Sequence, residues 1–222
     1  MLRLIAIDGP AGVGKSSVGK ALAKKFNINF FSTGEMYRCL GWKVLAQNID
    51  PQDEQKVLEI AQKIKWEYKA QDNVLKVYID GVCPLDKIHN EEVGRAASKV
   101  SAIPSARVLI MDEQKKLANS GNIVLEGRDI GTQIAPFAKV KIYLTATAQA
   151  RADRRVKQLK EAGQNPNYDE ILASIKSRDE RDSSRKIAPL KPAEDAHIID
   201  TSDLNLEEVI NKVLEIVNKN EW

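Results

Sequence analysis

The sequence contains few cysteine, histidine and aromatic residues, and it has no long hydrophobic run. Among its 222 residues are 2 cysteines and 2 histidines, and aromatic side chains make up 5%. Cys39 and Cys83 lie far apart and show no metal-ligand spacing, which argues against a zinc site and favours buried free thiols. The first apolar run ends at Asp8, before a signal-peptide core or a membrane span could form, so a cytoplasmic protein without membrane contact is predicted.

A strong excess of one charge is also missing. Lys and Arg together number 34 and Asp and Glu 31, which leaves a formal net charge of +3 and no overall field that would attract nucleic acid. The local basic stretch 151–160 carries no aromatic platform for bases, and a solvated helix face explains it better than RNA binding does. We therefore expect no nucleic-acid partner.

Short apolar runs alternate with amphipathic stretches along the chain. Alternation of this kind predicts an α/β fold with a central parallel sheet flanked by helices. Pro104 fits the start of one of these helices. Strands are predicted at 2–7, 30–31, 123–125, 140–144 and 196–199, and helices at 16–26, 35–47, 91–101, 105–119 and in a last segment that ends near residue 218.

Two segments interrupt the alternation. Between Lys65 and Leu85, short strand-like runs are separated by polar turns, which is typical of a small antiparallel insert. The charged segment 148–185 contains the turn residues 163–166 near its middle, and it predicts a mobile helical hairpin.

The strongest motif is Gly9-Pro-Ala-Gly-Val-Gly-Lys-Ser16, a match to G-x-x-x-x-G-K-[ST] between a predicted strand and a predicted helix. Its glycines let backbone amides approach phosphate, Lys15 supplies charge to the phosphates, and the Ser16 hydroxyl can hold magnesium. The alternative, a glycine-rich turn that binds nothing, does not explain the context. The candidate nucleotide-binding residues are Gly9, Pro10, Ala11, Gly12, Val13, Gly14, Lys15, Ser16 and Ser17.

Arginines follow the motif at predicted loop and helix ends. Guanidinium groups bind phosphate oxygens bidentately, and transfer between two phosphates depends on positioning and charge neutralisation. Any one of them could be a solvated surface residue, so the cluster carries the inference. Its members are Arg38, Arg107, Arg128, Arg178, Arg181 and Arg185.

Asp129 follows a predicted buried strand, at the sheet edge where open α/β proteins bind ligands. Its carboxylate could accept a hydrogen bond from a substrate amine. A helix cap or a loop ion pair is the structural alternative.

Taken together, the segments 9–17, 32–38, 126–131 and 178–190 resemble bacterial cytidylate kinases, and the insert 65–85 is similar to that family's enlarged monophosphate-binding region. The resemblance implies a P-loop NTPase fold with a helical lid, and transfer of the γ-phosphate from Mg-ATP to CMP or dCMP by a monomer. It implies one domain, 1–222, with a core of 1–32, 86–147 and 186–222, a monophosphate-binding region at 33–85 that also uses part of 90–107, and a lid at 148–185.

The resemblance also assigns roles. The implied catalytic residues are Lys15, Arg128, Arg178 and Arg185. The implied substrate contacts are Ser98, Arg107 and Asp129 to cytosine, Arg38 and Arg128 to the acceptor phosphate, and Arg178 and Asp182 to the sugar, with Thr33 and Arg185 also lining the site. The chain departs from the family pattern at Ser32 and Glu126, where Asp is more usual, and at Ser183-Ser184, where an arginine usually occurs.

Other functions remain open on the sequence alone. A P-loop kinase acting on UMP, dTMP or shikimate is the nearest alternative, and the segments 65–85 and 178–190 argue against it. A nucleotide-dependent switch is a second alternative, but the sequence shows no Asn-Lys-x-Asp base-recognition motif.

Overall fold

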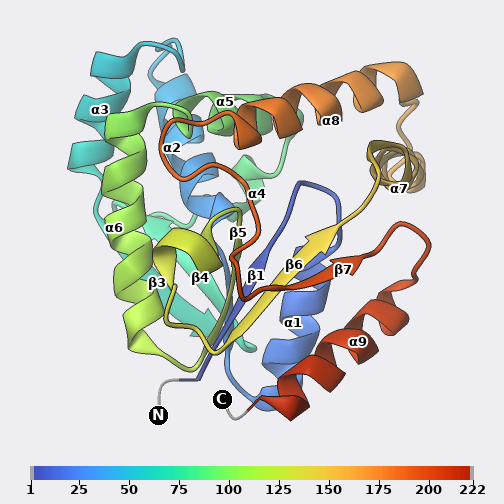
Figure 1. The fold of residues 1–222 in the computed structure, drawn as a ribbon. Helices are drawn as coiled ribbons and strands as arrows, with labels where there is room; N and C mark the ends of the chain where they lie inside the picture. The colour runs from blue at the N-terminus through green and yellow to red at the C-terminus, as the bar shows by residue number, and fades with distance from the viewer. Residues whose placement is uncertain (1–2, 221–222) are drawn as a thin grey trace.

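One sheet of seven strands runs through the computed structural model, which describes residues 3–220 (Figure 1). The strand order is β3-β4-β2-β5-β1-β6-β7, and every pair except β3–β4 is parallel. The α/β fold with a mainly parallel sheet is confirmed, although residue 2 of the first predicted strand lies outside the described residues. The strands are β1 Leu4–Asp8, β2 Asn29–Ser32, β3 Trp66–Gln71, β4 Val74–Ile79, β5 Ile123–Gly127, β6 Val140–Thr145 and β7 His197–Asp200.

Helices cover both faces of this sheet because the central strands are apolar on both sides. In β1, Leu4 and Ala6 join one hydrophobic core while Ile5 and Ile7 join the other, as the alternation of side chains along a strand requires. On the second face α1 (Lys15–Phe26) and α9 (Leu206–Lys219) pack together (Figure 1). The first face is covered by α2 (Gly34–Ala46), α3 (Glu54–Lys63), α5 (Glu91–Val100) and α6 (Pro104–Ser120).

The predicted antiparallel insert is present as the hairpin β3–β4, but it is not a separate sheet. Phe30 of β2 pairs with Val74 of β4, and the Phe30 amide donates to the Asn73 carbonyl at 2.8 Å. Val77 and Ile79 of β4 are buried in the same core as α2. The hairpin therefore continues the main sheet, because this pairing satisfies the free edge of β2 and buries the apolar side of β4.

Three elements were not predicted. α3 begins after Asp53, whose carboxylate accepts a hydrogen bond from the Lys56 amide at 3.1 Å as a helix cap. α4 (Leu85–Ile88) is a single turn, and η1 (Ile130–Ile134) is a short wide helix directly after β5. α4 and η1 are too short for the apolar pattern to indicate them, whereas α3 has apolar residues at helical spacing, Val57, Ile60, Ala61 and Ile64, which the prediction overlooked.

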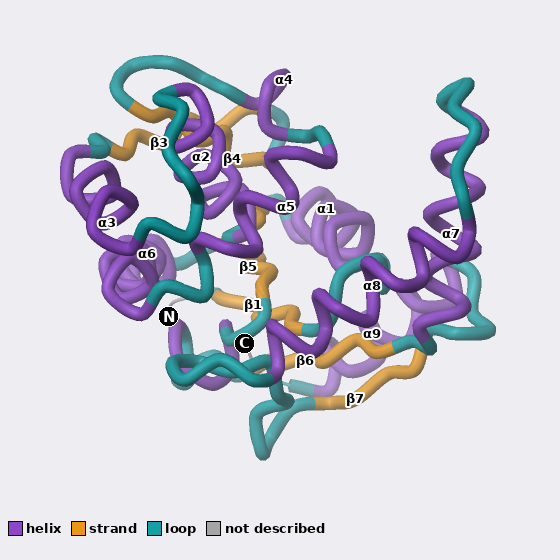
Figure 2. The backbone as a smooth tube through the Cα atoms, turned by 90° about the horizontal axis from the view of Figure 1, so that it is seen from above, coloured by secondary structure: helices purple, strands orange, loops and turns teal. Residues whose placement is uncertain are grey.

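The helical hairpin predicted at 148–185 is also present. It consists of α7 (Ala148–Glu161) and α8 (Tyr168–Ser183), which pack against each other, and the outer end of α7 reaches the periphery of the molecule (Figure 2). Among residues 3–220, no helix combines the length and the apolar character needed to cross a bilayer. Cys39 is a buried free thiol as expected, but Cys83 is only partly buried because it lies in the turn after β4.

Candidate active site

The loop between β1 and α1 holds the P-loop motif at the carboxyl end of the sheet. Gly9, Gly12 and Gly14 have φ values of 144°, 83° and 95°, in the region that side chains rarely adopt. At Gly9 a Cβ atom would also lie 2.0 Å from the Leu144 carbonyl oxygen. The glycines are thus required for this backbone path, which turns the first amides of α1 toward an incoming anion.

Lys15 is the buried cation of the loop. Only 6% of the residue is exposed, and its Nζ donates to the Pro10 carbonyl at 2.6 Å. Burial lowers the pKa of Lys15 to about 7, and the nearby Arg128 lowers it as well. A phosphate group beside Nζ would favour the charged form, so the site favours an anion there.

Ser16 and Glu126 meet across the site. The Ser16 hydroxyl donates to Glu126 Oε1 at 2.8 Å, while the other carboxylate oxygen, Oε2, is buried without a hydrogen-bond partner. Glu126 is held at the end of β5, next to β1 in the sheet. A hydroxyl beside a carboxylate with an unused oxygen is a donor set that suits a hard divalent cation.

A cavity of about 340 Å³, here named the inner cavity, opens beside the P-loop, and Arg178 and Asp182 of α8 form part of its wall. All nine residues that the resemblance assigns to the substrate lie in its wall, although the sequence spreads them over more than half of the chain. They are Thr33, Arg38, Ser98, Arg107, Arg128, Asp129, Arg178, Asp182 and Arg185, and the P-loop residues Ala11, Gly12, Lys15 and Ser16 line the same cavity.

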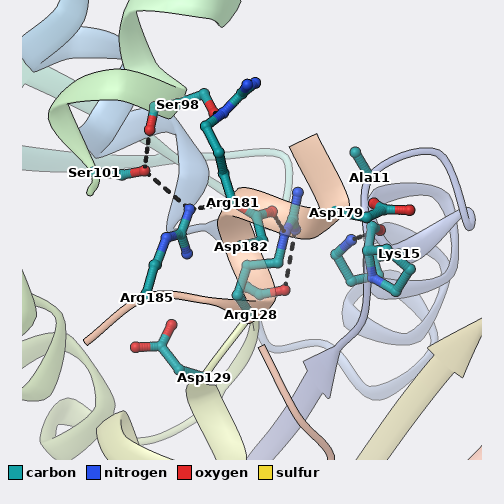
Figure 3. Close-up of polar contacts among 12 residues, drawn as sticks. Ala11, Lys15, Ser98, Ser101, Arg128, Asp129, Asp179, Arg181, Asp182 and Arg185 are labelled. Carbon is teal, nitrogen blue, oxygen red and sulfur yellow. Dashed lines mark hydrogen bonds and ion pairs between the residues drawn. The ribbon is translucent and has the colours of Figure 1, made fainter. Parts of the chain in front are cut away.

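Asp182 connects two of the arginines. Its Oδ2 accepts from Arg128 Nε at 2.8 Å, and its Oδ1 pairs with Arg185, whose guanidinium also donates to Ser101 Oγ at 2.9 Å (Figure 3). Burial alone would raise the pKa of Asp182, but Arg128 and Arg185 outweigh it and lower that pKa. The carboxylate is therefore ionised and fixes the position of both guanidinium groups.

A second buried pair lies at the far end of the inner cavity. Arg107 Nη2 and Asp129 Oδ2 are 2.9 Å apart, with side chains only 2% and 5% exposed, and the guanidinium lies 5.3 Å from the Tyr37 ring centroid. Burial raises the pKa of Asp129 and Arg107 opposes this shift. Asp129 does form an ion pair, as the structural alternative proposed, but one that is buried and faces the cavity; its side chain makes no helix cap.

The other three arginines of the cluster, Arg38, Arg178 and Arg181, differ in their hydrogen-bond partners. Arg38 Nη1 donates to the Ile88 and Asn90 carbonyls at 2.7 and 3.3 Å. Arg178 Nε is buried without a hydrogen-bond partner, and burial together with Arg128 lowers the pKa of Arg178 to about 10. Arg181 is exposed outside the cavity wall, where its Nε donates to Ser98 Oγ at 3.1 Å.

A second cavity of about 530 Å³, here named the outer cavity, lies on the other side of the P-loop. It is lined by the P-loop residues 12–18, by α7, and by apolar side chains at the start of α9. Gly9 and Pro10 line neither cavity and act through the shape of the loop. Gly12, Lys15 and Ser16 belong to both walls, so the two cavities meet at the P-loop.

The solvated-face interpretation of 151–160 is wrong for Arg151. This residue is 4% exposed, its guanidinium pairs with both oxygens of Asp179 at 2.9 and 2.5 Å, and its Nη1 donates to the Ala11 carbonyl at 3.3 Å. The helical hairpin turns this side of α7 toward the P-loop, so one face of the basic helix lines the outer cavity instead of facing solvent.

Asp8 lines neither cavity but supports the site from the end of β1, a role that sequence reasoning missed. Its two oxygens accept from the Ile130 and Gly131 amides at 2.8 and 2.7 Å, which fixes η1 beside β1. Burial raises the pKa of Asp8 to about 7 although these amides oppose the shift. A carboxylate ending an otherwise apolar strand next to the P-loop was the signal that could have identified it.

Comparison with known proteins agrees with this geometry. A sequence model of the family described as cytidylate kinase matches residues 5–219. A cytidylate kinase of Caldicellulosiruptor bescii is 45% identical over 215 residues, which cover 97% of this chain and 95% of that protein. Another, from Caldanaerobacter subterraneus subsp. tengcongensis, is 43% identical over 216 residues, again 97% of this chain and 95% of that protein.

A solved structure of shikimate kinase from Bacteroides thetaiotaomicron is similar with a TM-score of 0.50 and 14% identity, covering 99% of this chain and 98% of that one. At this identity the likeness concerns the fold alone and says nothing about the acceptor. The family match and the two bacterial relatives, by contrast, extend over nearly the whole sequence. The chain belongs to the cytidylate kinase family.

Proposed function

We propose that this enzyme transfers the γ-phosphoryl group of ATP to CMP or dCMP and releases ADP with CDP or dCDP. The observation that carries the proposal is the meeting of two cavities at Lys15, one of them lined by paired arginines and by Asp129. The bond between the γ-phosphorus and its bridging oxygen breaks, and a bond to an acceptor phosphate oxygen forms. This reaction needs positioned positive charge and no covalent intermediate.

The outer cavity suits the donor nucleotide. Backbone amides of the P-loop and Lys15 would hold its phosphates at the junction of the cavities, as anions are held at helix N-termini. The base and ribose would then lie between the inward face of α7 and the side chains of Leu204, Leu206 and Val209. Arg151 ties α7 to the P-loop and fixes the width of this cavity.

The inner cavity suits the acceptor. We propose that Arg38 and Arg128 bind the phosphate of CMP, and that Arg178 and Asp182 contact its sugar. Ser98, Arg107 and Asp129 would recognise cytosine, with Thr33 and Arg185 in the surrounding wall. The cytosine amine can donate to ionised Asp129, whereas uracil offers a carbonyl oxygen that this carboxylate repels.

Magnesium fits the polar groups at the junction. Ser16 Oγ and Glu126 would hold the ion, because Glu126 Oε2 is buried without another partner. When bound, the ion supplies positive charge that neutralises the donor phosphates. Lys15, Arg128, Arg178 and Arg185 add fixed positive charge around the transferring group, and residues 148–185 would act as a lid that excludes water from both cavities.

A coupled ADP-release assay tests the proposal. Purified protein with Mg-ATP is offered CMP, dCMP, UMP, AMP, GMP, dTMP and shikimate in separate wells. Turnover of CMP and dCMP well above the rest is expected. Preference for another acceptor would refute the assignment of Asp129, and no turnover with any acceptor would favour a nucleotide-dependent switch.

We propose a monomer that acts on small molecules, as the resemblance to bacterial cytidylate kinases implies. Because the reaction consumes ATP and nucleoside monophosphates, we place it in the cytoplasm. Size-exclusion chromatography with light scattering would test the monomer.

A further inference from the structure

Besides Glu126, which would hold magnesium, and the arginine-paired Asp129 and Asp182, the wall of the inner cavity contains one more carboxylate, Glu35. Glu35 is in the first turn of α2, directly after β2, and its side chain lines the cavity together with Ser16, Lys20 and Glu126. Ser16 and Lys20 are four positions apart and thus share one face of α1. Since Ser16 bonds to Glu126 at 2.8 Å, this face of α1 is turned toward the carboxyl ends of β5 and β2.

Hydrogen bonds hold the start of α2 beside Glu126, because the Thr33 amide and hydroxyl donate to the Glu126 carbonyl at 3.0 and 2.8 Å and Glu35 follows two residues later. Burial raises the pKa of Glu35 to about 7, the charge of Glu126 raises it further, and Lys20 and Arg38 oppose the shift. Carboxylates that repel each other in a partly buried wall favour a cation between them. Glu126 is 4% exposed and its Oε2 lacks a hydrogen-bond partner, so the cluster has an unused oxygen at its inner end.

The chemistry of magnesium explains how Glu35 could contribute to binding of the ion without contacting it directly. The ion keeps several of its water ligands in proteins and is bound by one or two carboxylates together with substrate phosphates. Groups that hydrogen-bond to those ligands orient them and tune the affinity. Ser32, at the end of β2, lines the same cavity. This chain therefore lacks a carboxylate at position 32 and has one at position 35.

We propose that Glu35 is a second acidic group of the divalent-cation site formed by Ser16 and Glu126, and that it binds the water ligands of the ion instead of the ion itself. In this arrangement Glu35 supplies, from the first turn of α2, a carboxylate that Ser32 at the end of β2 does not. The inference rests on the proposed function only in taking Ser16 and Glu126 as the groups that hold the metal beside the donor phosphates. Glu35 is accordingly a positioning residue.

Metal binding without turnover tests this role. Mn²⁺, a paramagnetic substitute for Mg²⁺, is titrated into the full-length protein with a non-hydrolysable ATP analogue, and free Mn²⁺ is counted by electron paramagnetic resonance. The variants are Glu35→Gln and the double variant Ser32→Asp with Glu35→Gln. Glu92→Gln is the matched control, because Glu92 is an exposed carboxylate in the first turn of another helix, α5.

The Mn²⁺ dissociation constant should rise about tenfold in Glu35→Gln, as for other groups that orient metal ligands. It should be unchanged in Glu92→Gln and should return toward the wild-type value in the double variant. An unchanged constant in Glu35→Gln overturns the proposal and leaves Glu35 as a partner of Lys20. A double variant as weak as Glu35→Gln also overturns it, because the loss would then reflect altered packing of α2.

The readout is independent of the acceptor. A protein that shows the expected pattern of Mn²⁺ binding but does not phosphorylate CMP would refute the proposed function and support the role of Glu35. If the protein phosphorylates CMP but the Mn²⁺ dissociation constant is unchanged in Glu35→Gln, the proposed function would be supported and the role of Glu35 would be refuted.

Discussion

The inner and outer cavities share the P-loop but differ in how their cations are held. In the inner cavity, Asp182 and Asp129 pair with arginines whose side chains are largely removed from solvent. In the outer cavity, the buried Arg151 also forms an ion pair, with Asp179, but Arg154 donates to the Thr201 hydroxyl at 3.1 Å and to backbone carbonyls, and apolar side chains form part of the wall.

The difference indicates how the two substrates are selected. Buried ion pairs keep guanidinium groups in fixed positions, so the inner cavity should discriminate strongly among acceptors by charge and hydrogen bonding. Backbone amides and apolar side chains recognise phosphates and flat rings with little regard to ring substituents. The outer cavity should therefore accept other nucleoside triphosphates more readily than the inner cavity accepts other monophosphates.

The largest effect is expected where the cavities meet. Lys15→Ala removes the cation that both walls share, and kcat with CMP should fall about a thousandfold or more because a fixed charge at the transferring group is lost. The coupled assay measures kcat, and far-UV circular dichroism should show an intact fold. A kcat within about tenfold of the wild-type value would contradict the central place of Lys15.

Separate substitutions of Asp129 and Asp179, one aspartate beside each cavity, test whether the two cavities bind different substrates. Asp129→Ala should lower the CMP to UMP ratio of kcat/KM by about 10- to 100-fold, the value of one good hydrogen-bonding contact to a base, with little change in the KM for ATP. Because alanine leaves Arg107 buried without its partner, Asp129→Asn is measured beside it.

Asp179→Ala is the matched variant on the outer side, since Asp179 holds Arg151. It should raise the KM for ATP and leave the acceptor ratio unchanged. If both aspartate variants altered the same constants, the distinction between the cavities would be lost.

Protonation of Lys15 provides a pH-dependent test of the junction. Its pKa is about 7 in the free protein, and donor phosphates raise it, so binding of ATP near pH 7 should take up about half a proton. Uptake should vanish at pH 5, where Lys15 is already charged. Isothermal titration in buffers of different ionisation enthalpy measures the uptake. Because Asp8 and Glu35 also have a pKa of about 7, the contribution of Lys15 is the difference from Lys15→Met, and equal uptake by the two proteins would contradict it. Lys15→Met is the control without the titrating group.

The smallest effect is expected at an exposed ion pair, although one of its members, Arg155, lines the outer cavity. Arg155 of α7 pairs with Glu91 of α5, and these side chains are 40% and 64% exposed. Arg155→Gln should lower the free energy of unfolding by less than about 1 kcal/mol, because water and salt screen an exposed pair. Urea denaturation at low and high salt measures this change. A loss above about 2 kcal/mol would show that the pair holds the helical hairpin closed.

Much of the fold was predictable because it depends on neighbours in the sequence. The apolar strands, the helices that follow them and the P-loop are encoded over short windows, and the structure confirms them. The helix α3 was missed although Asp53 and the helical spacing of Val57, Ile60 and Ala61 indicate it locally, and Arg151 was misassigned because a local charge pattern does not reveal which face of a helix is covered.

By itself, the sequence determined the P-loop and the α/β order, since bond geometry and hydrophobic periodicity act over a few residues. Only the tertiary structure decided which charges meet. Asp182 lies 54 positions from Arg128, and Ser16 lies 110 positions from Glu126, yet each pair is in hydrogen-bond contact. The order of strands in the sheet brings their carboxyl ends together, and burial there makes each charge depend on a partner that sequence distance does not reveal.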